Sequence, residues 1–302
     1  MTELISVRPL ALEDTIPADR IGHRLAMGVQ FADALSRLPV FAPLTCDLEA
    51  IGSRPCSRRC EIHNLGRQAL RHAGRLAKLL ARAVALGQST AFSLRVYGRR
   101  NPAVDGYLTD NDPRLYVPRR LALTPVLGAD GIPPASRDNI RNAWLWPGAA
   151  YPLPARATAL RGRIRKGLSL DQAVDVPWAR VVVTRPGSGA ADFTTEAKLA
   201  WGHGDDRGEF LVLLGAEAVP GGVSLPASLS LRLWVFLPPP AVSFDPADPL
   251  ASLPLEDGGT APSNDALRGT AIPPGYVQQA AIDLTVKPGG SQSIAEATLL
   301  YG

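Results

Sequence analysis

The chain has 302 residues, of which 46% are apolar and 20% are charged, and its formal net charge is +4. This length suits two domains that each bury a hydrophobic core without cross-links. Three cysteines, an odd number in a chain of this size, exclude a disulfide framework. No segment approaches 18 consecutive apolar residues, so the sequence predicts no membrane-spanning helix.

Residues 1–20 are predicted to form an N-terminal arm. They carry acidic residues and prolines where a secretory signal peptide needs a basic start and an apolar run. We therefore expect the protein to remain in the cytoplasm or to belong to a particle assembled there. The positive charge comes almost wholly from arginine, and alanine, glycine and proline are abundant, which indicates a GC-rich bacterial genome.

Residues 21–135 are predicted to form a first β-sandwich with a helical insert from His63 to Gly87. Within the insert, apolar residues recur near one helical face, and Gly87 is a typical stop signal. These apolar residues are Leu65, Ala69, Leu76, Leu80 and Ala83. Basic residues are spaced by 4, 4, 3 and 4 positions and predict one stripe on the opposite face: Arg67, Arg71, Arg75, Lys78 and Arg82.

This basic stripe has two interpretations of equal weight, a solvated helix face and a site for an anionic partner. Residues 54–100 hold eleven basic residues against Glu61 alone, or +10, whereas residues 238–302 hold two basic against seven acidic residues, or −5. An acidic protein surface is the favoured partner. Nucleic acid is disfavoured because no stacking aromatics interleave the insert and no nucleic-acid-binding motif is present.

Residues 136–157, rich in proline and aromatics, are predicted to be a linker packed between two sandwiches. Residues 158–238 are predicted to form the second sandwich, of roughly seven antiparallel strands. Leu160–Ile164 and Leu229–Val235 alternate as half-buried strands do, and Ala179–Val183 is nearly continuous in β-branched residues.

Within this second unit, His203, Asp205, Asp206 and Glu209 raise the question of a catalytic carboxylate pair. The segment GHGDDRG also fits a hairpin turn, in which Asp bonds downstream amides and Gly208 supplies a positive φ. We favour the turn, at an exposed hairpin tip in a high dielectric where nothing raises a pKa.

The pattern D-x-x-G-x-Phe in this turn, followed by an apolar strand and Pro-Gly, resembles the carboxypeptidase regulatory-like family. The resemblance covers residues 158–238 and extends, as a diverged copy, into the N-terminal half, where Tyr116 stands in the place of Phe210. It implies a transthyretin-like β-sandwich that acts as an accessory domain and carries no peptidase zinc site. The metallopeptidase motif HExxH is absent from the sequence.

Residues 239–302 are predicted to be an acidic C-terminal extension that ends in a hairpin. The predicted fold class is therefore mainly β, with two tandem antiparallel β-sandwich domains, a helical insert in the first and an extended C-terminal arm.

Cys56, Cys60 and His63, with Cys46 as a distant fourth, are the best metal-ligand candidates. Zinc sites commonly use Cys-x2-Cys pairs, whereas the cysteines here are spaced by x3 and no second pair follows. We expect unpaired or incidentally bridged cysteines, no metal and no cofactor. No nucleophile elbow, phosphate-binding loop or dinucleotide fingerprint is present, so we expect no enzymatic activity.

These features favour a non-enzymatic structural subunit of a larger bacterial protein assembly. In the resembled family such sandwiches are accessory parts of cell-surface proteins and of phage-tail-like particles. Because we expect no secretion signal, we favour the particle, as a tail, baseplate or cap-type component of a contractile injection system. One alternative is a carbohydrate- or protein-binding adhesion module, since sandwiches present loops at their ends. A weaker alternative is a nucleic-acid-associated protein that uses the basic helix.

Overall fold

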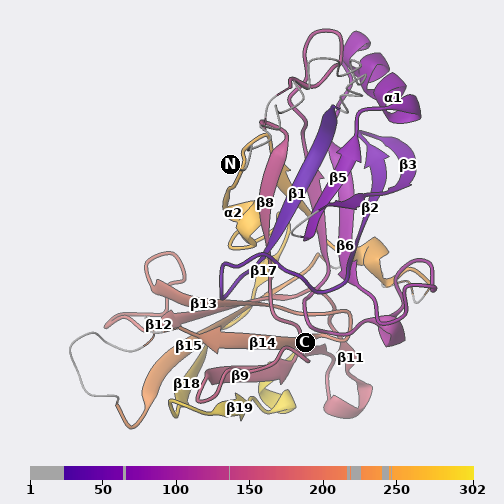
Figure 1. Ribbon diagram of the computed structural model, residues 1–302. Helices are drawn as coiled ribbons and strands as arrows, with labels where there is room; N and C mark the ends of the chain where they lie inside the picture. The colour runs from indigo at the N-terminus through magenta and orange to yellow at the C-terminus, as the bar shows by residue number, and fades with distance from the viewer. Residues whose placement is uncertain are drawn as a thin grey trace, which may run out of the picture.

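The protein folds into two β-sandwiches stacked end to face (Figure 1). The structure, a computed structural model, describes residues 24–63, 66–135, 137–215, 218, 226–239, 245 and 247–302. In Figure 1 the strands of the first sandwich run upright, and those of the second run roughly across them below. The predicted mainly β fold class is confirmed.

The first sandwich consists of a four-stranded and a five-stranded sheet. The four-stranded sheet has the order β4 (Glu61–His63), β5 (Arg67–Arg71), β1 (Leu25–Asp33) and β8 (Ile140–Leu145). The five-stranded sheet has the order β16 (Leu255–Gly259), β7 (Arg119–Leu123), β6 (Phe92–Gly98), β2 (Leu44–Ile51) and β3 (Arg54–Arg59). Alternate residues of both sheets, such as Phe31 and Phe92, meet in one buried core.

The second sandwich also pairs two main sheets around one core. One contains β13 (Ala197–His203), β12 (Arg180–Arg185), β15 (Leu229–Leu237), β17 (Val277–Gln278) and β18 (Ile282–Val286). The other contains β14 (Glu209–Leu214), β9 (Thr158–Arg163) and β19 (Ser291–Ser293). A small third sheet joins β11 (Val174–Asp175), β10 (Arg165–Lys166) and β20 (Leu300–Tyr301).

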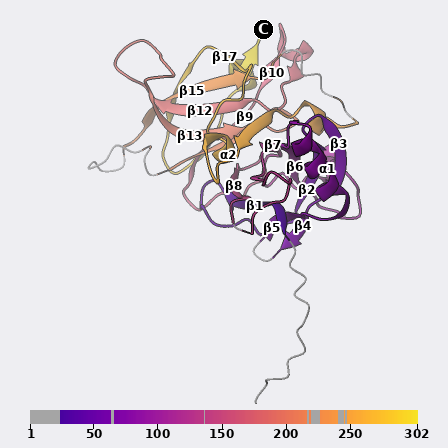
Figure 2. The same ribbon diagram turned by 90° about the horizontal axis from the view of Figure 1, so that it is seen from above.

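Helical structure is sparse in the described residues. The α-helices are α1 (Gly74–Ala85) and the one-turn α2 (Asp265–Arg268). Short 3-10 turns cover Thr109–Asn111, Leu170–Gln172, Pro249–Ser252 and Glu296–Leu299. Seen from above, α1 lies over the end of the first sandwich, with the second sandwich displaced to one side (Figure 2).

The predicted helical insert 63–87 is wrong over its first half. Residues 67–71 form strand β5, which pairs with β1 and β4, and the helix begins only at Gly74. Gln68, Ala69 and Leu70 are all buried in this sheet, so pairing with neighbouring strands outweighs the local helical period. Leu65, one of the expected apolar positions, lies outside the described residues.

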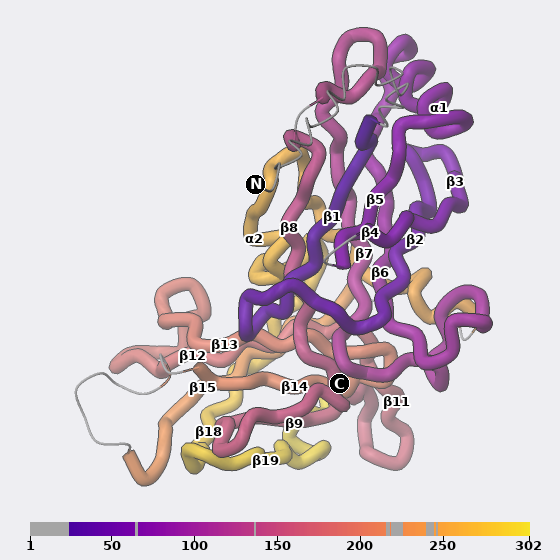
Figure 3. The backbone as a smooth tube through the Cα atoms, viewed as in Figure 1, coloured from indigo at the N-terminus to yellow at the C-terminus, as the bar shows by residue number. Residues whose placement is uncertain are grey.

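The predicted linker 136–157 and the boundary at residue 238 also need correction. The linker begins with β8, which pairs in parallel with β1 along its whole length, so the first sandwich extends to residue 145. The C-terminal segment does not stand apart from the sandwiches. It runs up into the first sandwich as β16 and returns to the second as β17, β18 and β19 (Figure 3).

The expected antiparallel order holds for most strand pairs but not for all of them. Among the strands that the structure describes, four pairs are parallel: β1 with β8, β7 with β16, β9 with β19 and β10 with β20. In each of these pairs the second strand arrives from far along the chain, where no short turn constrains its direction.

Candidate interaction surfaces

The turn between β13 and β14 lies at the junction of the two sandwiches, not at an exposed tip. Asp205 is only 4% exposed and Asp206 only 8%. The turn chemistry itself is as expected, because the Asp205 Oδ1 atom accepts hydrogen bonds from the backbone N–H groups of Arg207 and Glu209, both at 2.9 Å. However, β13 and β14 belong to opposite sheets and are joined next to the turn by the Gly204–Phe210 bridge, so the turn is a corner between sheets.

This corner contacts a loop of the first sandwich, residues 107–114. The Thr109 hydroxyl donates to the Asp206 carboxylate, and the Arg207 guanidinium donates to the Thr109 carbonyl oxygen at 3.1 Å. Arg114 forms an ion pair with Glu209. Sequence reasoning missed this contact because the partner loop is about 100 residues away in the chain.

Burial changes the acidity of the carboxyls gathered here. Burial, followed by the neighbouring Asp206 charge, raises the pKa of Asp205 to about 6. Burial likewise raises the pKa of Asp112 to about 6, against hydrogen bonds from the Arg114 N–H and the Tyr107 hydroxyl that lower it. The expectation that nothing raises a pKa at this turn is therefore wrong.

A buried carboxylate joins the two sandwiches at the centre of the same junction. Glu256 of β16 accepts two hydrogen bonds from Arg119 of β7, at 2.9 and 2.8 Å, and one from Arg180 of β12 at 3.2 Å. All three side chains are 3% exposed or less. Arg119 also donates to the carbonyl oxygens of Trp144 and Leu267. Since a buried charge is tolerated only when paired and hydrogen-bonded, this arrangement fixes the sandwiches relative to each other.

Aromatic side chains complete the junction. Trp178 is fully buried at a left-handed φ of 62°, and its indole N–H donates to the Ser252 hydroxyl at 2.8 Å. His203 stacks on Trp146, and its Nε2 atom donates to the Gly269 carbonyl oxygen at 2.9 Å. Burial, with the charges of Arg180 and Arg119, lowers the pKa of His203 well below its usual range. His203 is therefore a neutral structural residue of the interface.

The predicted basic stripe is divided between two elements. Arg67 and Arg71 lie on strand β5, and only Arg75, Lys78 and Arg82 lie on α1. Arg67 donates to the Gln30 side chain at 2.8 Å, and Arg71 forms an ion pair with Glu61 at 2.5 Å. The helix buries Leu76, Leu80 and Ala83 against the first core, as predicted.

The three helical cations form an exposed basic face, defined here as Arg75, Lys78 and Arg82. All three side chains are exposed, and they have no acidic partner among the described residues. Figure 1 places α1 at the end of the first sandwich farthest from the second. The basic face is therefore available to another molecule.

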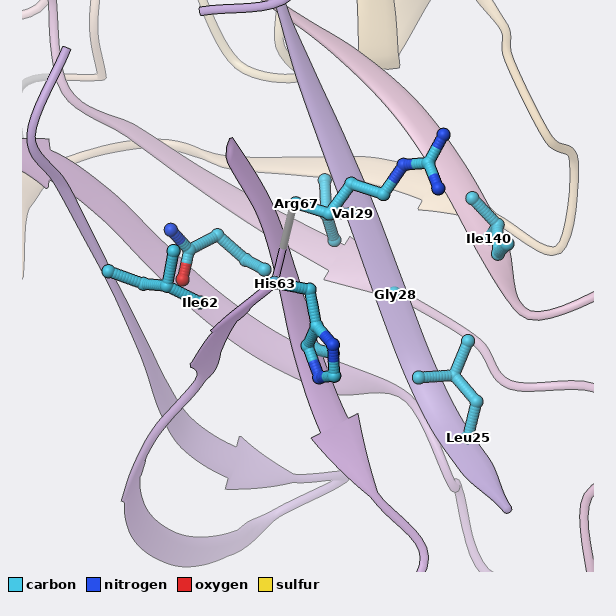
Figure 4. Close-up of a pocket in the computed structure, with 9 residues that line it drawn as sticks. Leu25, Gly28, Val29, Ile62, His63, Arg67 and Ile140 are labelled. Carbon is cyan, nitrogen blue, oxygen red and sulfur yellow. The ribbon is translucent and has the colours of Figure 1, made fainter. Parts of the chain in front are cut away.

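Arg67 borders a groove on the outer face of the four-stranded sheet. The register sets Gly28 opposite Ala69 on one side and Ile140 on the other, and the small side chains leave a hollow of about 470 Å³. Leu25, Ile62, His63, Arg67 and Ile140 surround it (Figure 4). The groove combines an apolar floor with one cation, and no carboxylate lines it among the described residues.

The structure brings Cys46 and Cys60 together but does not gather the four metal-ligand candidates at one point. Cys46, Cys56 and Cys60 are free thiols buried in the first core, where a hydrogen bond between Cys46 and Cys60, and then burial, raise the pKa of Cys46. His63 lies exposed on β4, in the opposite sheet from Cys56. Within the described part of the chain, no three His, Cys, Asp or Glu side chains are grouped as metal ligands. None of the described helices is long and apolar enough to cross a membrane.

The sequence matches no protein-family model and no curated protein sequence. Among solved structures, the minor pilin of Streptococcus agalactiae shows 8% identity and a TM-score of 0.20, covering 89% of this chain and 92% of that one. The TIE protein of Bacillus anthracis shows 9% identity and a TM-score of 0.22, covering 90% and 33%. A 9R-lipoxygenase from Cyanothece PCC8801 shows 17% identity and a TM-score of 0.21, covering 47% and 17%. Likenesses at these TM-scores support no inference about function.

Proposed function

We propose that this chain is a non-enzymatic structural subunit of a larger bacterial protein assembly and that it docks an acidic partner protein on the exposed basic face. The observation that carries the proposal is the position of Arg75, Lys78 and Arg82. They are exposed, lie at the far end of a two-sandwich body and form no ion pair with the described acidic residues. Charges arranged in this way attract a complementary surface and set its orientation.

The body behind this face suits a load-bearing role. Its two sandwiches are joined by the buried Arg119–Glu256–Arg180 contact, and the C-terminal segment supplies strands to both. A docked partner is then held at a fixed position relative to the second sandwich. The finer proposal, a tail, baseplate or cap-type component of a phage-tail-like contractile particle, rests on the resemblance to the carboxypeptidase regulatory-like family alone.

The test is a triple charge reversal, Arg75→Glu, Lys78→Glu and Arg82→Glu. Arg67 and Arg71 are left unchanged because their hydrogen bond and ion pair belong to the sheet. The matched control reverses three exposed cations elsewhere: Arg100→Glu, Lys166→Glu and Lys287→Glu. Each protein is coexpressed with the products of its neighbouring genes, and co-purification and particle formation are followed at low and high salt.

We expect wild type and control to assemble and the basic-face variant to fail, with wild-type assembly weakening as salt shortens the screening length below about 10 Å. Normal assembly of the basic-face variant would refute docking on this face. A high 260/280 absorbance ratio in wild type that is lost in the variant would mean that the partner is nucleic acid and not an acidic protein.

A further inference from the structure

Two cysteines of the first core face each other across neighbouring strands. Cys46 lies on β2, and Cys60 directly follows β3, which runs antiparallel to β2. The register pairs Asp47 with Arg59, so the next pair along the strands is Cys46 with Cys60. The Cys60 N–H group donates to the Cys46 carbonyl oxygen at 2.8 Å. Because opposed residues point to the same face of a sheet, both thiols enter the core side by side.

The two thiols are in contact and are shielded from water. They share a side-chain hydrogen bond, and Cys46 is only 1% exposed and Cys60 only 6%. Opposed residues of an antiparallel pair have Cβ atoms about 4.5–5.5 Å apart, whereas a disulfide needs about 3.5–4.5 Å. A bond between the two sulfurs therefore needs the strands to approach each other by about 1 Å.

The third cysteine is too distant to compete for this bond. Cys56 is also buried in the first core, but it lies on β3 four residues before Cys60. Four residues of a strand span about 13 Å, and the register shift between Leu48 and Ala50 shortens this to about 10 Å. A disulfide joins residues whose Cα atoms are less than about 7 Å apart. The strand register therefore selects Cys46 as the partner of Cys60.

Cys60 is the thiol of this pair that a reagent reaches first. It lies at the end of β3, the edge strand of the five-stranded sheet, and the end of an edge strand opens more easily than the centre of a core. Arg58 and Arg59 immediately precede it, with side chains that are 34% and 46% exposed. Their positive charge attracts an anionic reagent to this point.

We propose that Cys46 and Cys60 are a reversible redox pair, which a small disulfide such as oxidised glutathione converts into a disulfide bond. The Cys60 thiolate attacks one sulfur of the oxidant, whose S–S bond breaks and releases one thiol. The Cys46 thiol then gives up its proton and attacks the Cys60 sulfur of the mixed disulfide, and the second thiol of the oxidant leaves with a proton. Two protein thiols are oxidised, and one small disulfide is reduced to two thiols.

The bond has a structural consequence, because it fastens the edge strand β3 to β2. It closes the loop from Cys46 to Cys60, and such a cross-link stabilises a fold mainly by restricting the unfolded chain. The hydrogen bond with Cys60 and burial raise the pKa of Cys46, so the second step is faster in alkaline solution. A reducing glutathione pool keeps the pair as two thiols, and the bond forms under oxidising conditions.

The test treats the native full chain with millimolar oxidised glutathione at about pH 8. The chain is then unfolded, its remaining thiols are alkylated with N-ethylmaleimide, and its intact mass is measured. The untreated chain takes up three labels, one for each cysteine. We expect the treated chain to take up one label and to retain no glutathione, and dithiothreitol to restore all three. Three labels after treatment, or a glutathione adduct that persists, would overturn the proposal.

Tandem mass spectrometry of the linked peptides locates the bond in the wild-type chain. We expect the bond between Cys46 and Cys60 and the label on Cys56. We also expect oxidation to raise the melting temperature by about 5 °C, and reduction to reverse this. A bond that involves Cys56, a bond between two chains, or an unchanged melting temperature would overturn the proposal.

Variants separate the two steps of the reaction. Cys46→Ala removes the second thiol, so we expect glutathione to remain attached to Cys60. Cys56→Ala is the matched control, since it removes the third buried thiol and should form the bond as wild type does. A bond that forms in Cys46→Ala, or that is lost in Cys56→Ala, would mean that the register does not select the pair.

Discussion

At the scale of single residues, Glu256 has the strongest predicted effect on stability. One carboxylate compensates two arginines that are completely buried and belong to different sandwiches. Loss of one partner from a buried ion pair costs about 3–5 kcal/mol, because the remaining charge stays buried without compensation. Surface ion pairs contribute about 1 kcal/mol or less.

We therefore predict that Glu256→Gln lowers the free energy of unfolding by about 3–5 kcal/mol, as measured by urea denaturation. The control is Glu296→Gln, which removes a half-exposed carboxylate that faces Arg165 at 3.4 Å. Its cost should stay below about 1 kcal/mol. Similar losses of unfolding free energy in the two variants would mean that the buried contact stabilises the fold no more than an exposed ion pair does.

The buried carboxyls where loop 107–114 meets the corner between β13 and β14 predict a pH dependence of stability. The pKa of Asp112 is about 6 in the folded protein and 3.8 in the reference state. Between about pH 4 and pH 6 the folded protein therefore holds more protons than the unfolded chain, and this carboxyl destabilises the fold increasingly as pH rises. Buried His203 acts in the opposite direction, because its lowered pKa costs stability as pH falls.

Comparison of Asp112→Asn with wild type separates the two effects, since both proteins contain His203. The variant should gain about 1 kcal/mol relative to wild type between pH 5 and pH 7, from urea denaturation at each pH. A difference between Asp112→Asn and wild type that stays constant with pH would contradict the raised pKa of Asp112.

At the scale of elements, the corner between β13 and β14 depends on a glycine. Gly208 has a φ of 72°, and a Cβ atom there would lie 2.6 Å from the Ile164 carbonyl oxygen. Gly87, after α1, has a similar φ of 60°, but its added Cβ would meet nothing within 4 Å. An alanine at either position would be strained by the positive φ, but only at Gly208 would its Cβ atom also clash with neighbouring backbone.

We predict that Gly87→Ala costs about 1–2 kcal/mol, the usual penalty for alanine in the left-handed region. Gly208→Ala should cost clearly more, because backbone must move to relieve the clash. Thermal unfolding of both variants measures the difference. Equal melting temperatures would show that the corner relaxes without cost.

The sequence predicted those elements whose signal is local. Leu160–Ile164, Ala179–Val183 and Leu229–Val235 correspond closely to β9, β12 and β15, because alternation and β-branching are local properties. It predicted a C-terminal hairpin wrongly, since β18 pairs with β15 and β20 with β10, and such distant partners leave no local pattern. The basic stripe was wrong at Arg67 and Arg71 for the same reason: β5 is a strand through its pairing with β1.

At the scale of the whole molecule, the C-terminal segment makes the two sandwiches interdependent. Residues 255–259 complete the sheet edge beside β7, and residues 277–286 cover the edge of β15. Removal of residues 239–302 would expose both edges and leave Arg119 and Arg180 without their carboxylate. The resemblance to an accessory domain ending near residue 238 did not include these strands.

We therefore predict one cooperative unfolding transition for the full chain, seen at the same temperature by tryptophan fluorescence and by far-ultraviolet circular dichroism. A chain truncated after residue 238 should lack a cooperative transition and aggregate through its open strand edges. Two separate transitions in the full chain, or a stable truncated protein, would show that the sandwiches fold independently.

The parallel pairing of late strands with early ones also has a consequence for synthesis on the ribosome. The partner of β9, strand β19, lies some 130 residues later in the chain, and β16 follows its partner β7 at a similar distance. Neither sandwich can complete its sheets while the nascent chain is still short. The early strands therefore leave the exit tunnel with edge N–H and C=O groups that have no strand partner. Contacts this distant in sequence slow folding and lengthen the time in which chaperones can bind. The cell must therefore protect the early strands until residues 255–293 have been made.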